Sequence, residues 1–142
     1  MAHARFKTAL GLVALIGLGY VTYDYVAALM NPTYGISGTV YLAGKPLPKG
    51  IVRFISLDPD KPRFCGAYVH DGRYDLPKEF GLAPARYQVE FSSISPEDVQ
   101  RLLAAGKPVD VEEKIPFRYT VNSEVEIDLT SGAVLHADFD LK

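Results

Sequence analysis

The sequence predicts a mainly β domain, a sandwich of about seven short antiparallel strands with one short helix, preceded by an N-terminal transmembrane helix. Two observations lead to this prediction. After residue 34, apolar and polar residues alternate with period two in short segments, and Gly- and Pro-rich turns separate them. Such segments, spaced about 8–12 residues apart, are typical of a β-sandwich. Before residue 34, one long apolar run occupies Thr8–Met30.

The apolar run has the length and the flanking residues of a membrane anchor. Asp24 is its one charged residue. A helix over Thr8–Met30 would be about 33–35 Å long, enough to cross a hydrocarbon core of ~30 Å. Tyrosines gather at its C-terminal end as in an interfacial aromatic belt: Tyr20, Tyr23, Tyr25 and Tyr34. Small residues recur along it and form a candidate helix-packing interface, although small residues are also common in membrane helices generally: Thr8, Gly11, Ala14 and Gly17.

The charges around the run predict its orientation. Arg5 and Lys7 precede it, and no Lys or Arg follows until Lys45. The positive-inside rule then places the N-terminus in the cytoplasm and the C-terminal domain outside it, on the periplasmic or extracellular side. The sequence thus divides into a cytoplasmic tail with the anchor, a linker in which Pro32 ends the helix, and a periplasmic domain: residues 1–30, 31–34 and 35–142.

A cleavable signal peptide is the alternative interpretation. Its apolar region would be Ala9–Gly19 and its cleavage site Val26-Ala27-Ala28, and cleavage would release a soluble exported domain. Three tyrosines and an aspartate separate these two parts, which favours the retained anchor. A bacterial lipoprotein would need a cysteine just after the apolar region, but the one cysteine of the chain is Cys65.

Length and charge set limits on the domain. Residues 35–142 are enough for one ordinary domain with its own core. This part holds 13 of the 15 Lys and Arg residues and 16 of the 17 Asp and Glu residues, so it lacks the basic excess of a nucleic-acid-binding protein. A single cysteine allows no internal disulfide, and we expect Cys65 to be buried or to form an intermolecular bridge.

The elements of the domain follow from its periodicity. Asp71-Gly72 predicts a tight hairpin turn, and Tyr87, Val89 and Phe91 share one strand face. Ser95 as N-cap, Pro96 as first helical residue and Asp98 at a capping-box-like spacing begin the one helix, which Gly106 ends. Three apolar residues form a stripe along one face of this helix: Val99, Leu102 and Leu103. The expected strands are 36–42, 51–57, 64–69, 73–76, 85–92, 121–129 and 135–141.

Several of these segments resemble a known family. The matching motifs are Ser37-Gly38-Thr39-Val40, Gly44-Lys45-Pro46-Leu47-Pro48, Asp71-Gly72-Arg73-Tyr74-Asp75-Leu76, Leu82-Ala83-Pro84-Ala85-Arg86-Tyr87-Gln88-Val89 and Glu113-Lys114-Ile115-Pro116-Phe117-Arg118-Tyr119. Together they resemble carboxypeptidase regulatory-like, transthyretin-like domains of small exported bacterial proteins. The resemblance implies a seven-strand Greek-key sandwich that assists folding, adhesion or assembly and has no catalytic centre. Ala85 departs from it, since a Gly often stands there.

The residues that could carry chemistry are few and scattered. His70 lies beside Asp71, and His136 and Asp138 lie two apart on one strand. A closed zinc site needs three or four ligands, and no third ligand is identifiable near either pair. Asp58 and Asp60 share a loop without the oxygen-rich spacing of a calcium loop. Each of these side chains is more simply solvated.

The motifs of common enzyme classes are missing from the sequence. No serine lies in a Gly-x-Ser-x-Gly elbow, Cys65 has no neighbouring base, and no Gly-rich phosphate loop is present. The charged run Glu112-Glu113-Lys114 is expected to be a solvated loop. We therefore expect no catalytic, cofactor or metal site.

The function that follows is an interaction function. We expect a non-catalytic, membrane-anchored accessory or stabilising subunit of a larger integral membrane complex, for which respiratory and photosynthetic electron-transport assemblies are examples. Its partners would be the other subunits of that complex and the lipid bilayer, not nucleic acid. The alternative is an exported soluble binding module, for sugar or peptide, after cleavage of the N-terminal segment.

Overall fold

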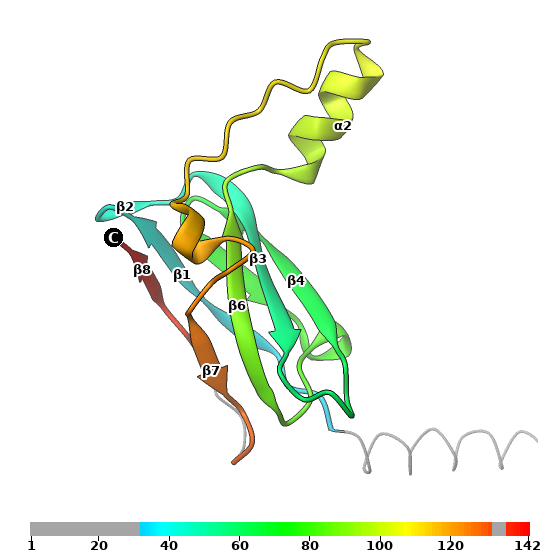
Figure 1. Ribbon diagram of the computed structural model, residues 1–142, viewed down its shortest axis with the longest axis vertical. Helices are drawn as coiled ribbons and strands as arrows, with labels where there is room; N and C mark the ends of the chain where they lie inside the picture. Colours follow the sequence, from blue (N-terminus) through cyan, green and yellow to red (C-terminus); the bar gives the residue numbers. More distant parts are fainter. Residues whose placement is uncertain (1–31, 132–135) are drawn as a thin grey trace, which may run out of the picture. The chain divides into compact units, whose positions relative to one another are not determined.

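A computed structural model describes residues 32–131 and 136–142 of the chain (Figure 1). Residues Thr33–Lys142 form one compact unit. No helix within the described ranges is long and apolar enough to cross a membrane. The Thr8–Met30 run, for which the sequence predicts a transmembrane helix, lies outside these ranges.

The described part is mainly β, as the sequence predicts, with a largely antiparallel, curled sheet and one α-helix. The strands are paired in the order β2-β1-β5-β4-β3-β6-β7, and β8, which lies off this path, pairs with β1. Their bounds are β1 Ile36–Leu42, β2 Lys45–Pro46, β3 Lys49–Ser56, β4 Phe64–His70, β5 Arg73–Leu76, β6 Arg86–Ser92, β7 Glu126–Asp128 and β8 Phe139–Leu141. The helix is α2, Pro96–Ala104, and two 3-10 turns are η1, Lys78–Phe80, and η2, Phe117–Tyr119.

The sheet curls around one apolar core. Phe91 on β6 and Phe139 on β8 lie on strands that are far apart in the strand order, yet their ring centroids are 5.0 Å apart. Tyr74 on β5 lies 6.1 Å from Phe139 and 6.2 Å from Phe54 on β3. The strand residues with the predicted period of two point into this core, and the largest are fully buried: Phe54, Tyr87, Phe91, Ile36, Val40, Val52, Val69, Val89 and Leu141.

Glycine is needed at two positions for two different reasons, a turn with positive φ and a close approach between segments. Asp71 and Gly72 both have positive φ, 50° and 76°, which is the backbone of the hairpin turn that the sequence predicts. Gly38 on β1 has no such φ, but a Cβ there would lie 1.8 Å from the carbonyl oxygen of Ala137. The segment that leads into β8 therefore packs directly on the backbone of β1.

The helix forms where the sequence predicts it, but its N-terminus is held differently. Gly106 has φ of 63° and ends the helix, and its N–H and that of Lys107 bond to Leu103 and Leu102 carbonyls. Ser95 occupies the N-cap position, yet its side chain makes no capping hydrogen bond. The Asp98 carboxylate does not complete a capping box; it pairs with Arg101 and Lys49.

The C-terminal strands differ from the prediction. β7 covers only Glu126–Asp128, because the chain turns at Thr120–Ser123 and leaves Val121 64% exposed. β8 pairs with β1 in parallel, so the expectation of antiparallel pairing is wrong for this strand. Alternation identifies which face of a strand is buried, but it carries no information on strand direction.

The segment around residues 112–114, which the sequence analysis expects to be a solvated loop, is held to the domain by the side chain of Glu113. Glu113 accepts hydrogen bonds from the Ser93 N–H and hydroxyl, the Ser92 hydroxyl and the Ile115 N–H, at 2.6–3.0 Å. Burial raises the pKa of this carboxyl, but the four hydrogen bonds together lower it more, so its pKa lies below the ordinary value. Glu113 thus fastens the segment that returns from α2 to the end of β6.

Candidate functional site

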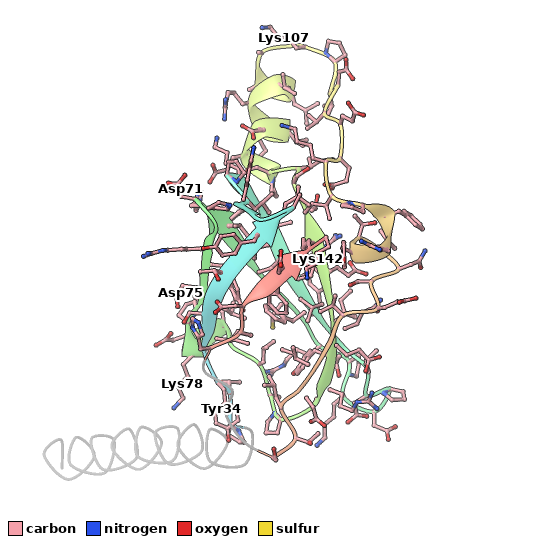
Figure 2. All side chains as sticks on the ribbon, turned by 90° about the vertical axis from the view of Figure 1, so that its left-hand side faces the viewer. Tyr34, Asp71, Asp75, Lys78, Lys107 and Lys142 are labelled. Carbon is pink, nitrogen blue, oxygen red and sulfur yellow. The ribbon has the colours of Figure 1, made fainter. Side chains whose placement is uncertain are left out.

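A hollow lies on the outer face of β1, β5 and β4. It is open, with a volume of about 710 Å³, which falls in the range of small-molecule sites. Three neighbouring strands and the segment before β8 supply its lining: Ser37, Gly38, Thr39, Tyr68, His70, Arg73, Tyr74, Asp75 and His136. Figure 2 shows Asp75 between Asp71 and Lys78.

Strand register places the polar lining residues in two rows. Arg73 on β5 is paired with His70 on β4 and with Thr39 on β1. Ser37 on β1 is paired with Asp75 and bridges to His136 in parallel. Because directly paired residues carry their side chains on the same face about 5 Å apart, each row presents neighbouring polar groups to the hollow.

Asp138 positions His136 at one side of the hollow. Its carboxylate accepts hydrogen bonds from the Thr39 N–H at 2.8 Å and the Thr39 hydroxyl at 2.7 Å. A carboxylate oxygen also lies 3.1 Å from Nε2 of His136. These hydrogen bonds, chiefly those from Thr39, hold the pKa of Asp138 below its ordinary value. The imidazole is therefore oriented by a carboxylate that is itself fixed to β1.

Aromatic rings form the opposite side. Tyr68 is 47% exposed, and its ring centroid is 6.3 Å from that of His70. The Tyr74 hydroxyl donates to the Ala137 carbonyl at 2.8 Å, and burial, with a smaller effect of Asp138, raises the pKa of this phenol. Tyr74 thus forms the buried base of the hollow, whereas the rings of Tyr68 and His70 are exposed at its side.

This arrangement can bind a polar ligand. Arg73 and Asp75 provide a donor fork and a carboxylate acceptor, the hydroxyl-bearing residues line the β1 side, and Tyr68 adds an apolar surface. No group of three or more His, Cys, Asp or Glu residues in the described ranges could hold a metal ion. The hollow therefore suits recognition by hydrogen bonds and ring contacts.

The structure brings two of the residues that the sequence analysis singled out together and leaves the others apart. His70 and His136, which the sequence gives no reason to connect, line the same hollow. Asp58 and Asp60 form a local turn in which the Asp60 N–H donates to the Asp58 carboxylate at 3.0 Å. Cys65 is half-buried instead of buried, and its thiol lies 3.7 Å from the Gly81 carbonyl. Burial raises the pKa of that thiol.

The proposed residues of the anchor are mostly outside the described ranges. This holds for the small-residue interface and for three of the four belt tyrosines: Thr8, Gly11, Ala14, Gly17, Tyr20, Tyr23 and Tyr25. The fourth, Tyr34, is half-buried and pairs with Leu82 in an isolated antiparallel bridge, with both N–H···O bonds formed, at 2.8 and 2.9 Å.

Of the residues that line the hollow, the sequence analysis singled out only His70 and His136 as candidates. The missed residues at outward strand positions are Ser37, Thr39, Tyr68, Arg73 and Asp75. The strand order and register decide that these positions are adjacent, and neither can be read from one strand alone.

Comparisons with models of protein families, with curated proteins and with solved structures found no match. The function of the domain must therefore be argued from its own residues.

Proposed function

We propose that this chain is a single-pass membrane protein whose periplasmic β-domain is a non-catalytic accessory or stabilising subunit of a larger integral membrane complex. In this proposal Thr8–Met30 is a retained anchor in the bacterial inner membrane with its N-terminus in the cytoplasm. The domain is, in this proposal, a transthyretin-like Greek-key sandwich of the carboxypeptidase regulatory-like kind. Respiratory and photosynthetic electron-transport assemblies are examples of suitable hosts.

The observation that carries the proposal is how closely the folded unit follows the apolar run. The run ends at Met30, and the compact unit begins at Thr33. Three residues span at most about 10–11 Å, so a retained anchor would hold the domain beside the membrane. A surface held there meets neighbouring membrane subunits at high effective concentration, and weak contacts then suffice for assembly.

The outer hollow offers such a surface. Its Arg73 and Tyr68 side chains are exposed and belong to residue types that contribute strongly to protein interfaces when they become buried. The small-residue stripe of the anchor would provide a second contact within the membrane. Two contacts of moderate strength, one above the bilayer and one within it, support a subunit role.

Extraction of native membranes in mild detergent tests the proposal. We expect the protein in a large complex, and we expect Gly11→Leu with Ala14→Leu, or Tyr68→Ala with Arg73→Ala, to shift it to smaller species. Lys107→Ala with Glu124→Ala, two exposed positions outside the hollow, is the matched control and should leave the complex intact. Migration of the wild-type protein as a monomer at every detergent concentration would refute the subunit function.

The hollow also favours a second candidate function, an exported soluble module that binds sugar or peptide. Its volume and its pairing of an exposed ring with Arg, Asp and His groups are suited to a polyhydroxylated or peptide ligand. The N-terminal mass of the purified protein distinguishes the two candidates. A mature N-terminus near Ala28 would favour the soluble module, and an uncleaved N-terminus would favour the anchored subunit.

A further inference from the structure

Two of the most exposed aromatic side chains lie at one end of the domain. Phe64, the first residue of β4, is 64% exposed, and Phe80, the last residue of η1, is 72% exposed. Leu57, in the loop after β3, is 41% exposed. Phe64 and Phe80 border one shallow hollow, which Thr33 also lines. Large apolar side chains exposed together in this way indicate a contact surface.

The chain enters the domain at this same end. β1 begins here, since Ile36 is paired with Leu76, the last residue of β5. The Thr33 hydroxyl donates to the carbonyl of Lys78, the first residue of η1, at 2.9 Å. Tyr34 pairs with Leu82, two residues after the end of η1. Figure 2 accordingly shows Tyr34 and Lys78 at one end of the domain and Lys107 at the other.

Hydrogen bonds join the two aromatic segments to each other. Nη1 of Arg63 donates to the Gly81 carbonyl at 3.3 Å, and the Cys65 thiol contacts the same carbonyl at 3.7 Å. Gly81 also packs so closely that a Cβ there would lie 2.2 Å from the Tyr34 carbonyl oxygen. These contacts hold Phe64, Phe80 and the beginning of the domain together in one surface, which we call the Phe64/Phe80 end.

We infer that the Phe64/Phe80 end rests in the headgroup region of the bilayer. This inference rests on the proposed function, because it requires Thr8–Met30 to be a retained anchor. Met30 and Thr33 are at most about 10–11 Å apart along the chain. The polar layer on each side of the hydrocarbon core is roughly 5–8 Å thick, so the Phe64/Phe80 end lies within reach of it. Aromatic side chains favour this region.

The charges of the two loops that carry the rings indicate the kind of lipid surface that these loops suit. Lys61, Arg63 and Lys78 are balanced by the three acidic residues of the same loops, Asp58, Asp60 and Glu79. A contact without net charge gains little from anionic lipid, since attraction to such lipid comes from an excess of basic residues. The end is therefore suited to a zwitterionic surface, with insertion of the two rings as the main contribution.

Single tryptophans can report this contact, because the chain contains no Trp. The full chain would be reconstituted into phosphatidylcholine vesicles as Phe64→Trp, Phe80→Trp or Phe117→Trp. Phe117, in η2, is 68% exposed and lies near Lys142, which follows β8 at the end of β1 opposite to Ile36, so it is the matched control. Phosphatidylcholines brominated on their acyl chains quench a tryptophan that reaches the bilayer.

We expect brominated lipid to quench the indole emission of the Phe64→Trp and Phe80→Trp variants strongly and that of Phe117→Trp hardly at all. Adding phosphatidylglycerol should change this little. Equal quenching in all three variants, or none at positions 64 and 80, would overturn the inference. Blue-shifted but unquenched emission at positions 64 and 80 would also overturn it, because a protein surface, such as a second copy, would then cover the rings.

A carbonate wash of the same vesicles separates this inference from the proposed function. Protein that the wash removes is not anchored, and the proposed function then fails together with the inference. Protein that resists the wash, but whose indole at position 64 or 80 is unquenched, retains the anchor and refutes only the lipid contact. Thermal unfolding of each variant should match the wild type, since all three replaced rings are exposed.

Discussion

The contact between Phe91 and Phe139 joins the last strand to the rest of the core, and its removal should be costly. Phe91 is 0% exposed and Phe139 is 8% exposed, and their rings meet edge to face at 5.0 Å. Replacement of a buried Phe by Ala costs about 3–5 kcal/mol through lost burial and a residual cavity. Since a domain of this size is stable by only ~5–15 kcal/mol, either variant should be close to unfolding.

Thermal unfolding of the full chain in mild detergent, followed by near-ultraviolet circular dichroism, measures this loss. About 4 °C per kcal/mol is appropriate for a domain of roughly 110 residues, so each single variant should melt ~12–20 °C lower. An edge-to-face pair contributes about 0.5–1.5 kcal/mol beyond its area, and the double variant should cost less than the sum of the single variants by that amount. Phe117→Ala, at an exposed ring, is the control.

Two results would refute this reasoning. A loss below about 1 kcal/mol at both positions would mean that the rings are not buried and that the register of β6 or β8 is wrong. Large but strictly additive losses would mean that both rings are buried but not in contact. In that case the sheet would not curl in the way that brings Phe139 on β8 against Phe91 on β6.

Three further predictions concern other features. Gly38→Ala should cost about 1–3 kcal/mol in thermal unfolding, because its Cβ would clash with Ala137, while Gly66→Ala, with its nearest contact at 3.3 Å, should cost less. The pKa of Glu113 is lowered on folding, so its contribution is present above the unfolded pKa of about 4.3 and is lost as pH falls through the folded value; Glu113→Gln, but not Glu112→Gln, should remove this part of the acid sensitivity of the melting temperature. In intact spheroplasts, added protease should digest the domain and spare the N-terminal tail; protection there with cleavage in inverted vesicles would reverse the orientation.

Local pattern was enough to predict most strands. β1 and β5 have the predicted bounds, and β6 differs by one residue at its start, because each alternates strictly and buries one face. The Asp71-Gly72 turn was predictable because both residues tolerate positive φ. The failures lie where local pattern carries no information. Val121 fits the alternation of β7, but a turn at Thr120–Ser123 excludes it from the strand.

The candidate site could not be predicted because it depends on strand pairing. His70 and His136 are 66 positions apart and look solvated when each is considered with its own neighbours. They line one hollow because β4 pairs with β5, β5 with β1, and the His136 segment runs parallel to β1. Glu113 was misjudged for the same reason, since two of its partners lie about 20 residues earlier, on Ser92 and Ser93.

Exposed apolar side chains at both ends of the domain are consistent with two different surroundings. If the Phe64/Phe80 end meets lipid, α2 and η2 lie away from the bilayer, and there Leu103 is 61% exposed and Phe117 is 68% exposed. A contact that buries either side chain in that orientation would be made with protein, not with lipid. A neighbouring subunit of the proposed membrane complex would supply such a contact. Lipid contact at Phe64 and Phe80 would thus leave α2 and η2 as surfaces for a protein partner.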